Sequence, residues 1–309
     1  MTDAVRITII TMTIISTLGF ILKKVKVTDK RTDKFISVLL VNYITPALMV
    51  HTALTQLSIS FFKDYYLNIV LAIGSLLLVN FIGILAAKLL KLKGLDRGQF
   101  LVMASFSNVV FIGIPLTTGI FGQKAIPYLM LYYVANTVTF WTLGIYQLSK
   151  STGGGIEAKS ILKVFNPPIV GFIIAFIFLW NGVSLPNYVM NSLDYLKDLT
   201  TPLSLIFMGS TIGDLSFKSI GSPVTTVSIL LLRFIISPVI ILILLRTFSI
   251  NPELGKVFIV CAGLPVMTNT ALAVERYGGN PSYASFMTAL SSILFIFVMP
   301  FYIELFTFL

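Results

Sequence analysis

An asparagine and two helix-breaking residues share one apolar stretch, "SFSNVVFIGIPLTTG", which covers residues 105–119. Asn108 comes first, and Gly113 and Pro115 follow it. Proline removes a backbone donor and costs about 3 kcal/mol inside a helix, and glycine weakens a helix by about 1 kcal/mol. The stretch is therefore predicted to be an interrupted helix with Gly113 and Pro115 as its hinge.

A second stretch, "AGLPVMTNTAL" at residues 262–272, repeats this arrangement, with the hinge residue Gly263 and then Pro265 followed by Asn269. The free amino-terminal end of a half-helix presents N–H groups and a positive dipole, which favour an anion. An amide side chain adds donors and an acceptor that suit a carboxylate. Asn108 and Asn269 are therefore candidate substrate-binding residues. Alternatively, each amide satisfies the broken backbone or a neighbouring helix.

Other polar residues in apolar stretches extend the candidate site. Hydroxyls flank the two amides, although a hydroxyl can also bond back to its own helix; they are Ser105, Ser107, Thr268 and Thr270. Asn136 lies in a run with Tyr132, Tyr133 and Trp141, where it either contacts substrate or only packs. Arg233 is the one charge deep in an apolar run, at a cost of about 2.5–3.5 kcal/mol on insertion scales. It either holds carbonyls of a broken helix or attracts a substrate anion.

Two further proline segments could line the site from an opposite, scaffold side, or could simply be kinks filled by packing. Their candidate residues are Asn42, Pro46, Thr201, Pro202 and Ser204. His51, the only histidine, could couple the protein to protons through its pKa, or it could be structural.

Composition places these residues in a membrane. Of 309 residues, 56% are hydrophobic and only 11% are charged, against roughly a quarter in soluble domains. Apolar runs near the roughly 20 residues that cross a bilayer predict about ten spans. We place them at 5–22, 34–56, 66–90, 99–121, 125–148, 161–180, 194–213, 222–246, 254–277 and 281–308.

The net charge of +10 arises between the spans rather than on one continuous face, so it does not indicate nucleic-acid binding. Basic residues gather in the first, third and fifth loops, which the positive-inside rule makes cytoplasmic. They are Lys23, Lys24, Lys26, Lys30, Arg31, Lys34, Lys88, Lys91, Lys93, Arg97, Lys150, Lys159 and Lys163. Both termini are then predicted to lie outside a plasma (inner) membrane that the chain crosses many times.

A glycine-rich segment at residues 149–160 is predicted to be a cytoplasmic linker between two five-span halves, 1–148 and 161–309. Five spans reverse the direction of entry, so a similarity between the halves indicates an inverted repeat. A shift of about 157 positions lays "TPALM" on "TPLSL", and it lays the first interrupted stretch on the second.

The chain resembles the auxin efflux carrier family. The similarity is carried by "SNVVFIGIPL" followed by "FG", and by "GLPVMTNTALAVERYGGNPSYAS" ahead of a final span with Pro300. It implies two inverted five-helix repeats whose fourth and ninth helices are broken and cross in mid-membrane, with an elevator-like movement of one bundle. Asn108 matches the crossover asparagine and Pro265 the crossover proline. Ser107 replaces the proline of many plant members, and the long cytoplasmic loop of some plant carriers is absent.

We therefore expect an all-α membrane protein that is a secondary transporter of small organic anions, with alternating access. The resemblance implies carboxylates such as malate or malonate, or auxin-like acids. A sodium-coupled bile-acid-type symporter is the nearest alternative, followed by a channel. An intramembrane enzyme is disfavoured by a single His, a single Cys and no mid-span carboxylate.

The remaining expectations concern ions and partners. No cofactor or metal site is expected, because Cys261 is the only cysteine. The coupling ion is left open between sodium and proton. The expected partners are the organic anion, the lipid bilayer and a second copy of the chain in a homodimer.

Overall fold

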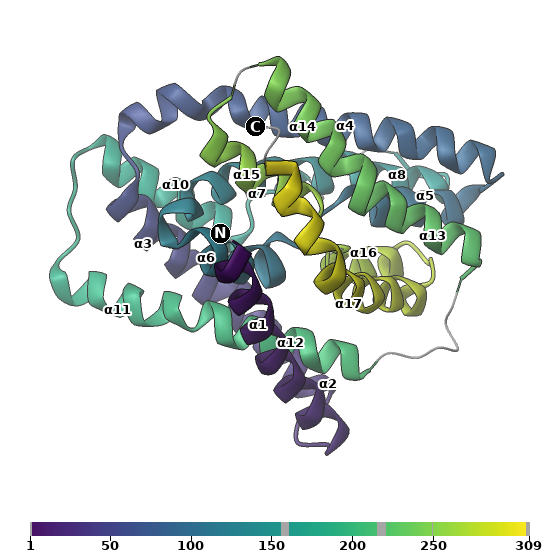
Figure 1. Ribbon diagram of the computed structural model, residues 1–309, viewed down its shortest axis with the longest axis horizontal. Helices are drawn as coiled ribbons and strands as arrows, with labels where there is room; N and C mark the ends of the chain where they lie inside the picture. The colour runs from purple at the N-terminus through teal and green to yellow at the C-terminus, as the bar shows by residue number, and fades with distance from the viewer. Residues whose placement is uncertain (1, 156–160, 215–220, 249, 307–309) are drawn as a thin grey trace. The chain divides into compact units, whose positions relative to one another are not determined.

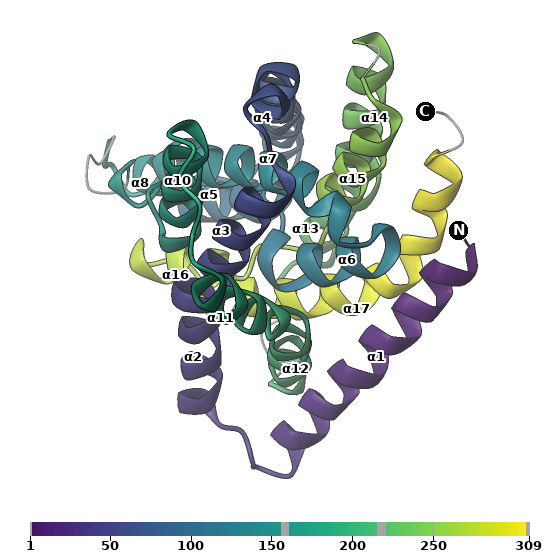
Figure 2. The same ribbon diagram turned by 90° about the vertical axis from the view of Figure 1, so that its left-hand side faces the viewer.

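The computed structural model describes residues 2–155, 161–214, 221–248 and 250–306 (Figures 1 and 2). Every named element in these ranges is helical, and a single isolated β-bridge is the other regular pairing described. The all-helical prediction is therefore confirmed for the described residues. The predicted linker at 149–160 lies partly outside them, because residues 156–160 are not described.

The α-helices are α1 (Thr2–Lys24), α2 (Lys30–Leu39), α3 (Thr45–Gln56), α4 (Ile59–Leu89), α5 (Gly94–Ser105), α6 (Ile114–Phe121), α7 (Ile126–Thr139), α8 (Ile145–Ser151), α10 (Pro167–Trp180), α11 (Asn187–Asp198), α12 (Thr200–Gly213), α13 (Pro223–Leu231), α14 (Ser237–Thr247), α15 (Pro252–Ala262), α16 (Asn269–Arg276) and α17 (Pro281–Leu305). Short π-helical segments are η1 (Leu40–Ile44), η2 (Val109–Gly113), η4 (Phe140–Gly144) and η6 (Leu232–Ile236), and η3 (Gln123–Ala125) is a 3₁₀ turn.

Five described helical stretches are long and apolar enough to cross a membrane, which supports a multi-pass membrane protein. They are Arg6–Lys24, Lys30–Gln56, Asp64–Leu89, Pro223–Thr247 and Pro281–Tyr302, and Val109–Phe121 and Pro167–Trp180 are shorter apolar helices. All ten predicted spans contain described helix, but a tenfold crossing of the membrane stays a prediction.

Two predicted spans differ from the observed helices at their starts. The span at 161–180 contains α10, which begins only at Pro167, because the Asn166 side chain caps it by accepting from the Ile169 N–H. The span at 194–213 is divided at Leu199, where α11 ends and α12 begins. Proline at the start of a helix loses no hydrogen bond, and this accounts for the position of Pro202 in the first turn of α12.

The chain forms two compact units. The first unit comprises Met1–Ile69, Val110–Val134 and Phe165–Asp214, and the second comprises Val70–Val109, Ala135–Val164 and Leu215–Leu309. Each unit draws segments from both predicted halves of the chain. The halves are therefore not the compact units, and their relation as inverted repeats stays a prediction.

Close helix packing in the first unit depends on glycine. A Cβ atom on Gly209 of α12 would lie only 1.8 Å from the carbonyl oxygen of Ser16 in α1, and one on Gly19 would lie 2.1 Å from that of Ile206. Gly209 and Gly213 are four residues apart, the spacing that lets membrane helices approach closely. α1 and α12 consequently lie side by side in Figure 1, and α3 packs along α10 and α11 in Figure 2.

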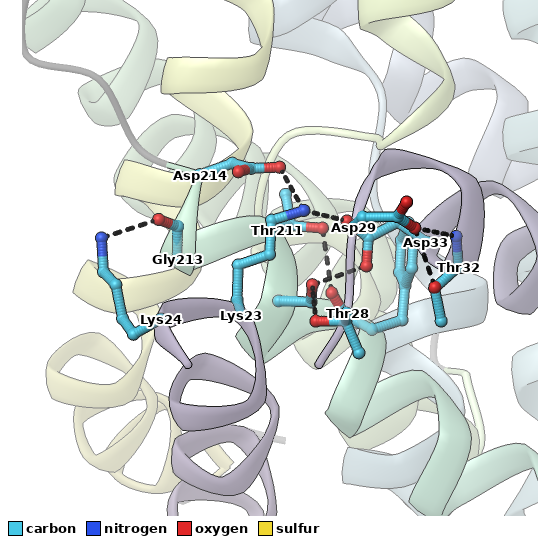
Figure 3. A network of polar contacts seen from close by, with 11 residues as sticks. Lys23, Lys24, Thr28, Asp29, Thr32, Asp33, Thr211, Gly213 and Asp214 are labelled. Carbon is cyan, nitrogen blue, oxygen red and sulfur yellow. Dashed lines mark hydrogen bonds and ion pairs between the residues drawn. The ribbon is translucent and has the colours of Figure 1, made fainter. Parts of the chain in front are cut away.

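A polar network joins the ends of α1, α2 and α12, as Figure 3 shows. The Lys23 ammonium lies 2.5 Å from a carboxylate oxygen of Asp33 and 2.7 Å from one of Asp214. The Ser210 hydroxyl donates to the other Asp33 oxygen at 2.5 Å, and Lys24 donates to the Gly213 carbonyl. The network ties the three helix ends together, with the side chains of Lys23 and Asp33 only 9% and 14% exposed and that of Asp214 48% exposed.

Helix α5 lies in the core of the second unit. Every residue from Gly98 to Ser105 is buried, and α5 packs against α8, α13, α16 and α17. A helix that is covered on all sides has no solvent to satisfy its broken end. The polar groups at the carboxyl end of α5 must therefore find partners inside the protein.

Candidate functional site

Two helix interruptions in the second unit pair with each other. α5 ends at Ser105 and α15 ends at Ala262, and non-helical segments at residues 106–108 and 263–268 connect each helix to the next. Ser107 and Val266 form an antiparallel bridge. The Asn108 N–H donates to the Pro265 carbonyl at 3.0 Å, and the Met267 N–H donates to the Phe106 carbonyl at 3.1 Å. Each break thus satisfies backbone groups that the other has freed.

The predicted hinge at Gly113 and Pro115 was misplaced. Helical structure runs without interruption from Val109 through Gly113 and Pro115 to Phe121, and the break precedes it at residues 106–108. Pro115 needs no N–H partner in the first turn of α6, and the wider π-helical turn of η2 directly precedes that helix. The same sequence of a π-helical segment and then a proline occurs at Pro46 and Pro238.

Gly263 does lie at the second break, where it caps the carboxyl end of α15. A Cβ atom at this position would lie 2.2 Å from the Tyr302 hydroxyl oxygen. That hydroxyl is within 3.0 Å of the Phe234 carbonyl and 3.4 Å of the Gly263 carbonyl, which can both accept from it. Glycine is therefore required for the close approach of α17 to the break.

Arg233 donates to carbonyls of both interrupted helices. It is completely buried, and its guanidinium donates to the Leu264 carbonyl through Nε at 2.9 Å and Nη2 at 2.5 Å. The same group reaches Ala262 of α15 at 3.2 Å and Ala104 of α5 at 3.4 Å. The Ser107 hydroxyl accepts a further bond at 2.7 Å. The sequence left two roles open for Arg233, holding the carbonyls of a broken helix or attracting a substrate anion, and these contacts perform the first.

Asn136 is also committed to the broken backbone. Its side-chain oxygen accepts from the Ser107 N–H at 3.0 Å, and its amide nitrogen donates to the Ser107 carbonyl at 3.1 Å. With only 1% of its surface exposed, it acts in place of the missing helical partners of Ser107. A direct contact of Asn136 with substrate stays a prediction.

Asn108, Thr268 and Asn269 lie where the second break leads into α16. The Asn108 amide donates to the Thr268 hydroxyl at 2.9 Å. Thr268 stands at the N-cap position of α16 without a capping side-chain bond, so first-turn N–H groups of this helix lack intrahelical partners. Asn269 is half-buried, and the hydroxyl of the buried Thr270 has no partner among the described residues. The Thr270 N–H donates to the Met267 carbonyl at 3.0 Å, so the backbone N–H groups of Thr268 and Asn269 are the ones left without a partner among the described residues.

The charges around the two breaks leave a positive excess. The carboxyl ends of α5 and α15 each carry about half a negative elementary charge, and the guanidinium of Arg233 balances both. The amino-terminal ends that follow the breaks keep their positive partial charges. The described carboxylates of this unit all lie within three residues of a helix end; they are Asp96, Glu253, Glu275 and Glu304. In the described chain, no group of three His, Cys, Asp or Glu residues could hold a metal ion.

The scaffold-side candidates belong to the first unit. Pro46 packs against Gly171 of α10, where a Cβ atom would lie 3.1 Å from the Pro46 carbonyl oxygen. Ser204 is buried and donates to the Thr201 carbonyl, whereas Asn42 and Pro202 are exposed. Their contribution to a binding site stays a prediction. His51 pairs with Asp194 at 3.2 Å, a contact that the sequence did not indicate.

Sequence reasoning missed three polar residues that support the breaks. Asn80 of α4 donates to the Ser105 hydroxyl at 3.1 Å and exchanges hydrogen bonds with Gln147 of α8. The Ser291 hydroxyl of α17 accepts from the Val266 N–H at 3.1 Å. An amide inside the apolar run "LLLVNFIGIL" was the available signal for Asn80.

Residues 4–161 and 155–303 match the model of a family described as Membrane transport protein. An uncharacterized transporter of Methanothermobacter thermautotrophicus is 29% identical over 278 residues, which cover 87% of this chain and 88% of that protein. An uncharacterized transporter of Methanocaldococcus jannaschii is 27% identical over 208 residues, covering 64% of this chain and 66% of that protein.

Proposed function

Because the chain belongs to the membrane transport protein family, the family of the auxin efflux carriers, we propose that this membrane transporter is a secondary carrier of small organic anions. The cargo class comprises carboxylates such as malate or malonate, and auxin-like acids. The anion binds beside the paired breaks of the second unit, next to Asn108, Thr268 and Asn269.

The paired helix breaks carry this proposal. Within a bilayer, a break in a helix is tolerated only where protein or a water-filled cavity surrounds it, and in transporters such breaks form the substrate site. Here Arg233 and Asn136 already satisfy the carbonyl side of the breaks. The groups that remain are the backbone N–H groups of Thr268 and Asn269 and the side-chain amide of Asn269, which suit a carboxylate rather than a cation.

Transport proceeds by an elevator-type movement in this proposal. Such a mechanism needs one body that carries the site, and the second unit contains both breaks with their polar supports. The inverted repeat of five and five helices, with crossing helices at α5–α6 and α15–α16, belongs to the same proposal. The location of both termini outside the plasma membrane, and the homodimer, also stay predictions.

Ligand-dependent melting of the purified protein tests the cargo class. A ligand present at 100 times its Kd stabilises the folded state by about 2.7 kcal/mol. We expect one or more carboxylates from a panel of malate, malonate, succinate and indole-3-acetate to raise the melting temperature. Choline and glucose, which offer no carboxylate, should leave it unchanged. Repeating the series with sodium and with potassium separates a sodium-coupled carrier from the others.

Variants locate the site. Asn108→Ala and Asn269→Ala should each weaken carboxylate binding, whereas Asn181→Ala, an exposed amide that bonds only the Ile177 carbonyl of its own helix, should not. Asn108→Asp keeps the size of the side chain but places a negative charge beside the cargo, so it should bind more weakly still. A carboxylate that binds all four variants as it binds the parent protein would contradict this site, and a panel without any stabilising carboxylate would contradict the cargo class.

A further inference from the structure

A cavity of about 360 Å³ opens between α4, α5 and α8 in the second unit, and it includes the amino-terminal end of α5, opposite to the end that leads into the break. Its wall includes two cationic side chains, Arg97 and Lys150, and the ring of Tyr146. Lys150 lies over that ring at 5.5 Å from its centre. Among the described residues, neither Arg97 nor Lys150 forms an ion pair with a carboxylate. Both cations at the cavity are therefore free to bind an anionic group.

The amino-terminal end of α5 adds to this charge. Gly94 and Gly98, in the first turns of the helix, line the cavity, and the N-cap residue Lys93 makes no capping side-chain bond. First-turn N–H groups and the positive end of the helix dipole point out of this end, and Asp96 in the same turn offsets part of the dipole, so Arg97 and Lys150 supply most of the positive charge. At Gly94 an added Cβ would meet nothing closer than 3.9 Å, so the backbone there is open, whereas at Gly98 the Cβ would lie 2.5 Å from the Ser151 hydroxyl oxygen, so this glycine lets α8 pack on α5. The cations, the helix end and the concave wall together suit a group with several negatively charged oxygens.

Part of the wall is apolar and lies beside an exposed apolar stripe on α4. Ile84, Leu101 and Leu143 line the cavity below the cations. Beside it, Leu77, Phe81 and Leu85 form a stripe along α4 with 47%, 58% and 47% of their surface exposed. Residues spaced by four lie on one face of a helix, so this stripe runs next to the face that carries Asn80 and Ile84. An acyl chain can leave the cavity along it.

The depth of the cavity matches the boundary of a bilayer. The membrane-crossing part of α4 ends at Leu89, and Asn80 at the inner end of the cavity lies roughly 13 Å further in at 1.5 Å per residue. The polar headgroup layer is only about 5–8 Å thick on each side. The cavity thus reaches from the headgroup layer into the hydrocarbon region, on the side that the basic loops predict to be cytoplasmic.

The inner end of the cavity is closed by hydrogen-bonded amides. Gln147 donates to Asn80 at 2.6 Å, and Asn80 donates back at 3.1 Å and onward to the Ser105 hydroxyl. Since both amides already have partners, the charged part of a ligand would gain no hydrogen bond by moving deeper into the cavity. Its negative oxygens stay at the outer end, beside Arg97 and Lys150.

We propose that this cavity binds an anionic phospholipid, with the phosphate held by Arg97, Lys150 and the amino-terminal end of α5 and one acyl chain along Ile84, Leu101 and Leu143. Bound lipid would restrain α5 at the end opposite to the break at residues 106–108. The site is separate from the proposed carboxylate site, and lipid binding is measurable whatever the transported anion is.

Melting of the full-length protein in a neutral detergent tests this site. Phosphatidylglycerol should raise the melting temperature in a saturable manner, and phosphatidylcholine and soluble glycerol 3-phosphate should not. A basic residue near an anionic lipid contributes about 1 kcal/mol, which is about fivefold in affinity. Arg97→Gln and Lys150→Gln should therefore each weaken phosphatidylglycerol binding about fivefold, and the double variant about 25-fold. Lys88→Gln, an exposed cation at the same end of α4 but outside the cavity, is the matched control.

Two further variants keep the test decisive if a glutamine variant is unstable. Arg97→Lys retains the charge and should keep most of the affinity, whereas Leu143→Phe narrows the apolar wall without changing any charge and should weaken binding. The proposal is overturned if the double glutamine variant binds phosphatidylglycerol like the Lys88→Gln control. It is equally overturned if phosphatidylcholine stabilises as well as phosphatidylglycerol, or if glycerol 3-phosphate alone produces the full effect.

Discussion

Replacement of Arg233 is the sharpest test of how the paired breaks are held together. Arg233→Met keeps a long apolar side chain but removes every donor of the guanidinium. Two of the acceptors lie close, the Leu264 carbonyl at 2.5 Å and the Ser107 hydroxyl at 2.7 Å. Because Arg233 is fully buried, water cannot replace the lost donors without entering the core.

The size of the effect follows from those two acceptors. Leaving a buried polar group without its partner costs about 1–3 kcal/mol, so two such groups cost about 2–6 kcal/mol. The charge also balances the carboxyl ends of α5 and α15, which would repel each other in its absence. A central figure of about 4 kcal/mol corresponds to a fall of about 8 °C in the melting temperature of a chain of this size.

Arg233→Met also has an effect of opposite sign, on insertion into the membrane. Removing the charge lowers the cost of inserting the segment into the membrane by about 2.5–3.5 kcal/mol. That gain concerns insertion and appears in the amount of protein in the membrane. Melting of the purified, already inserted protein reports only the loss of the donors, so the two effects are measured separately.

Arg246→Met is the matched control, because Arg246 is exposed in the last turn of α14 on the same helical stretch. Arg233→Lys should fall between the parent and Arg233→Met, since an ammonium keeps the charge but lacks the planar fork of donors. If Arg233→Met melts within 2 °C of Arg246→Met, about 1 kcal/mol by the same scale, the support of the breaks by Arg233 is refuted.

Three further predictions concern a glycine contact, an ion pair and a helix cap of the first unit, and the control for the first, Gly74, lies in the second unit. Gly209→Ala should destabilise the protein by about 1–3 kcal/mol, because the added Cβ would meet the Ser16 carbonyl oxygen at 1.8 Å. Gly74→Ala, whose Cβ would meet nothing within 4 Å, should stabilise the protein by about 0.5–1 kcal/mol. Equal melting temperatures of the two variants would contradict the packing of α1 on α12. Lys23→Met should cost about 2 kcal/mol by leaving Asp33 and Asp214 without their cation, and an Asp33→Asn change in the same protein should recover part of it. The Thr32 N–H donates to the Asp29 carboxylate and holds its pKa below the ordinary 3.8, so the contribution of Asp29 to stability is present above pH 3.8 and is lost as the pH falls through the lowered pKa. The difference in melting temperature between the parent and Asp29→Ala should therefore be constant from about pH 5 to 8 and shrink in acid. A difference that grows in acid would contradict the sign of this effect.

The sequence located the second break well and the first one poorly. Gly263 and Pro265 stand at the observed interruption, because Leu264 and Pro265 there adopt no helical conformation. Gly113 and Pro115 looked equivalent, yet both are helical. A proline two residues into a helix costs little when a wider turn precedes it, and no local pattern distinguishes that case from a break. The bridge to Val266, which is distant in sequence, fixes the first break at Ser107.

For the side chains that support the breaks, too, the sequence indicated some residues and only the tertiary structure showed their partners. Asn108 and Arg233 stood out because amides and charges are costly in lipid, whatever surrounds them. That Arg233 serves the carbonyls of Leu264 and Ala104 depends on three segments far apart in the chain, so only tertiary structure reveals it. Asn80 gave the same kind of signal as Asn108 but no neighbouring helix breaker marked it as part of a site, and the serine hydroxyl of Ser291 gave a weaker one, since it can bond back to its own helix.

The sequence by itself determined the solvent, the helical class and the family, because hydrophobic run length, charge distribution and local motifs are properties of neighbouring residues. Only the tertiary structure decided where the helices break, which groups satisfy the freed backbone, and that Arg97 and Lys150 line one cavity. Those features arise from contacts between segments separated by tens to more than a hundred residues. A hydrogen-bond partner at that separation is chosen by packing, which no local pattern encodes.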